Sequence, residues 1–285
     1  MAEFREQFIT VNDVKLHVVE AGPQDGEVVL FLHGYPEFWY SWRKQLNFFA
    51  DKGYRAIAPD QRGYNLSDKP EGIDAYQLDK LAGDIAGLID ALGVDQVNLV
   101  GHDWGSLVTW WTATRYPEKL KTITTINAPH PYVMLDNLES SVGQLLKSWY
   151  ALFYQIPGVP EQVMSKDNFA RLKASLLGSI PGSFTDEDLT KHVEAWSQPG
   201  ALTNMVNWYR ALIQRRPERI PYLKIPAPAL VIWGVHDIYL GQEMASRNAD
   251  LCMDCRIVYF ENNTHWVVDE EPDAINQLIL GHIIR

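Results

Sequence analysis

Short apolar runs alternate with longer amphipathic segments along most of the chain. Residues 28–32 are apolar at every position, which is typical of a strand covered on both faces of a sheet. The runs that we interpret as strands cover residues 8–11, 14–19, 28–32, 54–58, 97–100, 122–126, 229–233 and 256–260. Apolar residues at helical spacing fill segments 41–51, 76–92 and 273–284. The chain is therefore predicted to be an α/β protein with a mostly parallel sheet that starts with one hairpin.

The pattern changes between residues 131 and 217. This segment has helical spacing and many Trp, Tyr and Phe residues, without a run of the alternating strand type. Thr185, with Asp188 three residues later, predicts a capped helix start, and residues 202–213 predict a later helix. We therefore expect a helical cap (residues 131–217) inserted into one core domain (residues 1–130 and 218–285).

Composition narrows the classes of partner. The 285 residues are 46% hydrophobic and carry a net charge of -11, which argues against nucleic acid and against an anionic membrane surface. No apolar run approaches the length of a membrane span, so we expect a cytoplasmic protein without a membrane partner. Cys252 and Cys255 are too few for a zinc site and are expected to be reduced thiols. Monomer and homodimer both remain open.

The turn at residues 101–105 contains a candidate catalytic nucleophile. Gly101-x-Asp103-x-Gly105 follows a predicted strand and has the spacing of the G-x-S-x-G nucleophile elbow, with aspartate in place of serine. An ionised carboxylate can attack an alkyl carbon without a base, and the resulting ester can be cleaved by water. The elbow therefore predicts an epoxide or an alkyl halide as the electrophile. A serine-type esterase is disfavoured because the elbow lacks a hydroxyl.

Two further residues complete a triad in the order nucleophile, acid, histidine. Asp237 follows the strand at 229–233, and His265 follows the last strand. In this interpretation Asp103 attacks, His265 activates water against the ester, and Asp237 orients the imidazole. The backbone amides of Tyr35 and Trp104 are predicted to form the oxyanion hole.

The leaving group distinguishes the two electrophiles. An opening epoxide leaves an alkoxide, which needs an acidic donor such as a tyrosine hydroxyl, whereas a halide needs only weaker N–H donors. The cap offers Tyr150 and Tyr209 as candidates. Aromatic residues at helical spacing are more often core residues, so composition alone does not assign them this role.

Four motifs together resemble the epoxide hydrolases of the α/β-hydrolase fold. They are His33-Gly34-Tyr35-Pro36-Glu37, Asp60-x-Arg62-Gly63-Tyr64-x-x-Ser67-Asp68-Lys69-Pro70, Gly101-His102-Asp103-Trp104-Gly105 and Asn207-Trp208-Tyr209-Arg210. The resemblance covers nearly the whole chain and implies an eight-stranded, mostly parallel sheet with flanking helices and a helical cap.

The resemblance also implies site residues. Asp103 would be the nucleophile, with Asp237 and His265 as its charge partners, and two cap tyrosines would activate the epoxide oxygen. Tyr209 matches within its own motif, whereas Tyr150 is placed by a similar run and Tyr154, one turn away, stays a rival. Pro36 is expected to follow a cis peptide bond.

Other members of the fold use the same aspartate elbow. Haloalkane dehalogenases often have asparagine where this chain has Tyr35, and fluoroacetate dehalogenases place arginines where it has Trp104 and Leu107. A non-catalytic receptor on this fold is a further alternative. The leading hypothesis is hydrolysis of a small, neutral, apolar epoxide by water, without a cofactor or metal. The expected aromatic walls of the substrate tunnel are Phe38, Trp39, Trp104, Trp149, Phe153 and Trp208.

Overall fold

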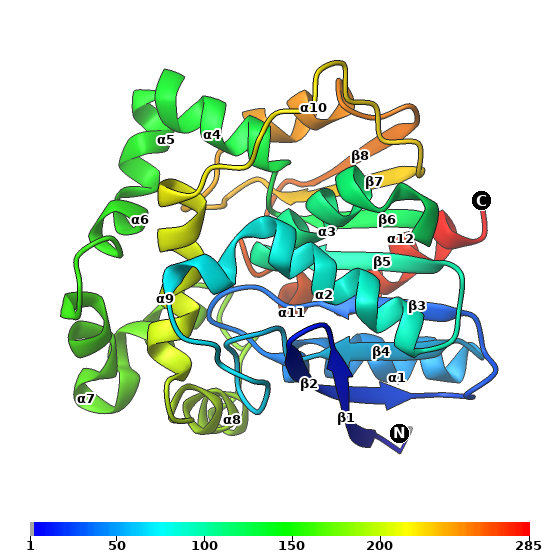
Figure 1. Cartoon of the computed structure of the whole chain (residues 1–285), viewed down its shortest axis with the longest axis horizontal. Coiled ribbons are helices and arrows are strands. Elements are labelled where there is room, and N and C mark those ends of the chain that lie inside the picture. Colours follow the sequence, from blue (N-terminus) through cyan, green and yellow to red (C-terminus); the bar gives the residue numbers. More distant parts are fainter. Residues whose placement is uncertain (1–2) are drawn as a thin grey trace.

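The computed structural model describes residues 3–285 and has a central eight-stranded sheet (Figure 1). The strand order is β1-β2-β4-β3-β5-β6-β7-β8; β1 and β4 run antiparallel to β2, and the remaining neighbours are parallel. The strands are β1 (Arg5–Val11), β2 (Val14–Ala21), β3 (Val28–Leu32), β4 (Arg55–Pro59), β5 (Val97–His102), β6 (Leu120–Ile126), β7 (Ala229–Gly234) and β8 (Cys255–Phe260). The predicted fold class is confirmed.

Helices cover both faces of the sheet. Alternate residues of β3 belong to different cores: Leu30 packs in the cluster that includes helices α2 and α3, and Phe31 in the cluster that includes α1 and α12. This division explains why the run 28–32 is apolar throughout, because a strand between two helical layers has no solvent face. The helices are α1 (Arg43–Asp51), α2 (Leu78–Ala91), α3 (Trp104–Arg115), α10 (Glu243–Ala249), α11 (Val267–Glu270) and α12 (Pro272–Ile283).

Six helices lie between β6 and β7 and extend to one side of the sheet (Figure 1). They are α4 (Pro131–Ser140), α5 (Val142–Lys147), α6 (Trp149–Phe153), α7 (Val159–Leu176), α8 (Asp186–Trp196) and α9 (Ala201–Gln214). Thr185 forms the expected capping box with Asp188 at the start of α8. Helix α7 is interrupted where Asp167, Asn168 and Phe169 adopt positive φ. We propose residues 131–217 as the cap on the core formed by 1–130 and 218–285; residues 1 and 2 lie outside the described part.

Some elements were not predicted. Helices α10 and α11 of the core were missed, and helices α4, α5 and α7 were not predicted individually within the expected helical cap. A 3-10 turn at Trp39–Trp42 replaces the start of the helix expected over 41–51, and another at Ile73–Tyr76 precedes α2, which begins two residues after the expected start at residue 76. Helices α10 and α11 contain too few turns for a clear periodicity, and the positive φ values of Asp167, Asn168 and Phe169 interrupt the helical pattern of α7. Cys252 and Cys255 are both free thiols. Within residues 3–285, every helix is too short or too polar to cross a bilayer.

Candidate active site

Asp103 sits on a tight turn between β5 and α3. Its φ of 50° and ψ of -120° are strained for a residue with a side chain. A Cβ on Gly101 would lie 2.3 Å from the carbonyl oxygen of Gly105, and a Cβ on Gly105 would lie 2.0 Å from that of Leu32. The two glycines let the turn pack against β3 and lift the Asp103 side chain above the end of the sheet.

Gly105→Ala should therefore lower the free energy of unfolding by about 3 kcal/mol or more, because the added methyl collides with backbone that cannot move away. Gly281→Ala in α12 is the matched control, since open space surrounds that position, and it should leave stability unchanged or raise it by up to about 1 kcal/mol. Urea unfolding of both variants measures the difference. Equal stability of Gly105→Ala and the wild type would contradict this account of the turn.

The structure brings the three predicted triad residues together. His265 Nδ1 lies 2.7 Å from Asp237 Oδ2, and its Nε2 lies 3.4 Å from Asp103 Oδ2. Asp237 Oδ1 accepts hydrogen bonds from the backbone amides of Tyr239 and Leu240, and Asn127 Nδ2 donates to Asp237 Oδ2 at 2.7 Å. Asp237 is thus fixed from several sides, and it orients the imidazole toward Asp103.

Electrostatics favour an ion pair between His265 and the carboxylates. Burial alone would lower the pKa of His265, but the charge of Asp237 and the hydrogen bonds to Asp103 and Asp237 raise this pKa well above its usual value. Burial would raise the pKa of Asp237, and the charge and hydrogen bond of His265 lower it. This arrangement favours the imidazolium form of His265, whose two ring nitrogens face Asp237 and Asp103.

A second buried acid–histidine pair lies behind the triad. His102 Nε2 is 2.8 Å from the carbonyl oxygen of His265, and its Nδ1 is 2.8 Å from Glu37 Oε2. Both ring nitrogens thus face acceptors, and although burial opposes the charge, Glu37 raises the pKa of His102. His102 in turn lowers the pKa of Glu37 to about 2, against the effect of burial. This pair fixes the backbone of His265.

Glu37, His102 and Asn127 were not predicted as site residues. Glu37 and His102 belong to motifs that carried the family resemblance, but no role was assigned to them. Asn127 offered a clearer signal, since it directly follows β6 just as the nucleophile follows β5. Carboxyl ends of neighbouring parallel strands meet at one edge of the sheet, so its proximity to the triad could have been inferred.

The amide of Tyr35 donates to Asp103 Oδ1 at 2.7 Å, as expected of an oxyanion-hole donor. The Tyr35–Pro36 peptide bond is cis, which confirms that expectation. The amide of Trp104 is the first of helix α3 and stays a predicted second donor. One oxygen of the Asp103 carboxylate is thus held by backbone, and the other faces His265.

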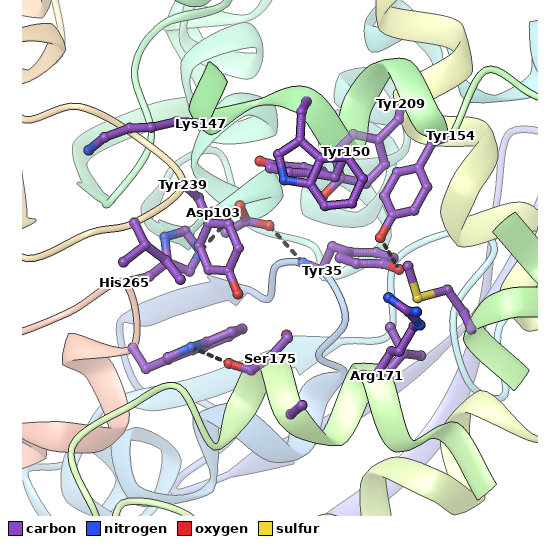
Figure 2. A pocket seen from close by; sticks show the side chains of 16 residues that line it. Tyr35, Asp103, Lys147, Tyr150, Tyr154, Arg171, Ser175, Tyr209, Tyr239 and His265 are labelled. Carbon is purple, nitrogen blue, oxygen red and sulfur yellow. Dashed lines mark hydrogen bonds and ion pairs between the residues drawn. The ribbon is translucent and has the colours of Figure 1, made fainter. Parts of the chain in front are cut away.

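A cavity of about 410 Å³ opens above Asp103 (Figure 2). Asp103, His265, Tyr150 and Tyr209 all line it. The other lining residues are mostly aromatic or apolar, with Lys147, Arg171 and Ser175 among them; they are Tyr35, Lys147, Trp149, Tyr154, Met164, Arg171, Leu172, Ala174, Ser175, Ile238, Tyr239 and Trp266. A smaller cavity of about 30 Å³ shares Asp103, Tyr150 and Tyr209 with the first and includes Trp104 in its wall.

The cap tyrosines differ in their hydroxyl partners. The hydroxyl of Tyr154 lies 2.8 Å from that of Tyr35, and Figure 2 draws this contact. Within residues 3–285, the hydroxyls of Tyr150 and Tyr209 have no hydrogen-bond partner, and the two rings lie 5.8 Å apart. Burial, and then the charge of Asp103, raise the pKa of both phenols well above the usual value. Both are protonated donors available to a ligand.

Four expected wall residues line neither of these two cavities. Trp208 and Tyr209 are neighbours on α9, so they point in different directions, and Trp208 Nε1 donates to the carbonyl oxygen of Arg62 in the core. Phe38 packs on His192, Trp39 packs on Phe4, and Phe153 lies beside Trp149. Trp104 and Trp149 do line cavities, and Tyr239 and Trp266 supply aromatic walls that were not predicted.

The described residues of the site do not form a set of metal ligands. Among residues 3–285, no group of three or more His, Cys, Asp or Glu side chains is placed to hold a metal ion. The site instead offers a carboxylate, an imidazole and two phenols, which are groups for nucleophilic and acid–base chemistry.

Known proteins are similar to this chain over most of its length. A family model described as the alpha/beta hydrolase fold matches residues 27–272. The chain is 43% identical to the AB hydrolase superfamily protein YfhM of Bacillus subtilis over 97% of each protein. It is 40% identical to Epoxide hydrolase 1 of Caenorhabditis elegans, covering 96% of this chain and 69% of that protein. A crystal structure of a Bacillus megaterium epoxide hydrolase with an inhibitor has a TM-score of 0.90 at 30% identity, covering 98% of this chain and 100% of that chain.

Proposed function

Because this chain belongs to the epoxide hydrolases of the α/β-hydrolase fold, we propose that it converts small, neutral, apolar epoxides and water into vicinal diols. One observation carries the proposal: the Asp103 carboxylate and the unpaired hydroxyls of Tyr150 and Tyr209 line the same cavity. A nucleophile and two acids around one space fit an electrophile whose leaving group is an oxygen on the same molecule.

The first step opens the ring. Asp103 Oδ2 attacks a ring carbon, while Oδ1 stays on the Tyr35 amide and becomes the ester carbonyl oxygen. The carbon–oxygen bond of the epoxide breaks, and its electron pair stays on the epoxide oxygen, which takes a proton from Tyr150 or Tyr209. Attack removes the charge of Asp103, one of the causes of the raised phenol pKa values, so each tyrosine becomes a stronger acid as the alkoxide forms.

His265 then changes its protonation state. It enters the reaction protonated and returns a proton to the tyrosinate, which leaves a neutral imidazole. Formation of the ester also removes the charge of Asp103 that helps to raise the pKa of His265. The same bond formation that creates the ester thus creates the base that will hydrolyse it.

The second step cleaves the ester. Neutral His265 takes a proton from water as the oxygen attacks the Asp103 carbonyl carbon, and Asp237 stabilises the imidazolium. The Tyr35 amide stabilises the oxyanion, with the Trp104 amide as the proposed second donor. The ester bond between the carbonyl carbon and the alkyl oxygen breaks, and the leaving alkoxide takes the second proton of the attacking water. The diol departs, which leaves Asp103 as a carboxylate and His265 as an imidazolium.

Replacement of either donor tyrosine tests the ring-opening step. Tyr150→Phe and Tyr209→Phe should each slow single-turnover alkylation by about 10²-fold, because an acid that stabilises the alkoxide is lost. Tyr154→Phe is the matched control. Because the Tyr154 hydroxyl already pairs with that of Tyr35, this variant should slow alkylation by less than about tenfold. If Tyr154→Phe were slow and Tyr150→Phe fast, the second donor would be Tyr154.

An epoxide and a chloroalkane with the same carbon skeleton test the function itself. We expect diol from the epoxide and no chloride from the chloroalkane. Chloride release without diol would identify a dehalogenase. Tight binding of the epoxide without either product would identify a receptor.

A further inference from the structure

Helices α5 and α6 present apolar side chains to solvent. Val142 is 74% exposed, Leu146 69% and Trp149 58%. These helices lie at the outer edge of the inserted segment, away from the sheet (Figure 1). We define the cap apolar patch by its exposed members: Val142, Leu145, Leu146, Trp149, Leu152 and Ile156. Large exposed apolar residues that gather in one segment mark a contact surface more often than isolated ones do.

The charge of this segment differs from the rest of the chain. The chain has 36 Asp and Glu residues, yet residues 142–160 contain none, and Lys147 is the one charged residue in this stretch. Lys147 Nζ donates to the backbone carbonyl of Asp237, so its charge sits at the edge of the patch. The segment that forms the patch therefore has one cation and no carboxylate, although the protein as a whole is strongly acidic.

The cap apolar patch is continuous with the mouth of the large cavity. Trp149 belongs to both, and Ile238, which is 64% exposed, lines the cavity beside it. Lys147 and Arg171 line the same opening (Figure 2). An apolar molecule could thus pass from the patch to Asp103 without crossing a carboxylate-rich surface.

We propose that the cap apolar patch docks on a neutral, zwitterionic lipid surface. Exposed Leu and Val side chains with a tryptophan among them are the groups that insert into the boundary between headgroups and acyl chains. The net charge of -11 opposes an anionic surface, so the contact is hydrophobic. A second copy of the chain seated there would cover the cavity mouth, whereas a lipid surface can deliver an apolar ligand to it. This proposal revises the expectation that the protein has no membrane partner.

Flotation with phosphatidylcholine vesicles, without any substrate, tests the docking. The wild type should float with the vesicles, and Leu146→Glu and Leu152→Glu should each lower the partition coefficient about tenfold, because each replaces an exposed aliphatic side chain that the lipid would cover. Met253→Glu is the matched control: Met253 is 72% exposed in the core domain between α10 and β8, and this variant should float like the wild type. Higher salt should not release the wild type.

Several results would overturn the proposal. They are a wild type that stays in the aqueous fraction, equal loss in Met253→Glu, and a dimer in size-exclusion chromatography that Leu146→Glu converts to a monomer without any vesicle binding. Leu146 and Leu152 lie outside the cavity walls, so turnover of a water-soluble epoxide should be the same in both variants as in the wild type. Because the binding assay needs no turnover, it stays valid if the proposed function is wrong.

Discussion

Asparagine in place of Asp103 should slow diol formation by a factor on the order of 10⁴ or more. The amide has nearly the shape of the carboxylate and can still accept the hydrogen bond from the Tyr35 amide. It is neutral, however, and its oxygen is a poor nucleophile toward an alkyl carbon. The loss should therefore appear in the alkylation rate, measured in a single turnover with enzyme in excess.

The loss of activity in this variant is informative only if the protein is still folded. Asp103 directly precedes α3 and its side chain makes no cap hydrogen bond to that helix, so the neutral amide should preserve the fold. Thermal unfolding and circular dichroism check that expectation. Mass spectrometry of the intact chain must show that the asparagine has not deamidated, since this would regenerate the nucleophile. Full activity of an intact asparagine variant would exclude Asp103 as the attacking group.

Substitution of His265 should have a different effect, because it blocks the second step. In His265→Gln the Asp103 carboxylate remains, so one equivalent of epoxide should still open and stay on the protein as an ester. Steady-state turnover should fall by about 10⁴-fold or more, since no base activates water. Intact-mass spectrometry should show a gain equal to the mass of one epoxide.

The double variant Asp103→Asn, His265→Gln is the matched control for trapping. It should show no mass gain, because the acceptor of the alkyl group is lost. A mass gain in the double variant would place the adduct on another residue. Rapid turnover by His265→Gln would mean that a different group activates water.

Much of the fold could be predicted because buried strands and helices have characteristic patterns of apolar residues in the sequence. The strand at residues 28–32 was predicted with its observed ends, since a strand between two helical layers must be apolar at every position. The order of Asp103, Asp237 and His265 after separate strands was equally readable. Because the carboxyl ends of parallel strands meet at one edge of the sheet, the positions of the strand ends are enough to predict that such residues lie close together.

The walls of the cavity could not be predicted in the same way. Phe38, Trp39 and Trp208 are aromatic and close in sequence to site residues, but their direction depends on how the cap and core pack. Tyr239 was missed because its place beside His265 depends on the loop after β7, which has no periodic pattern. The choice between Tyr150 and Tyr154 likewise depended on a hydroxyl partner, Tyr35, that is remote in sequence.

The central claim is that the chain carries out catalysis through an ester on Asp103, and one turnover in ¹⁸O-labelled water tests it most directly. With enzyme in excess, water attacks the Asp103 carbonyl carbon, so the label should enter the carboxylate of the Asp103 peptide and be nearly absent from the first diol formed. Label in that first diol, with an unlabelled Asp103, would mean that water attacks the epoxide itself and would contradict the account.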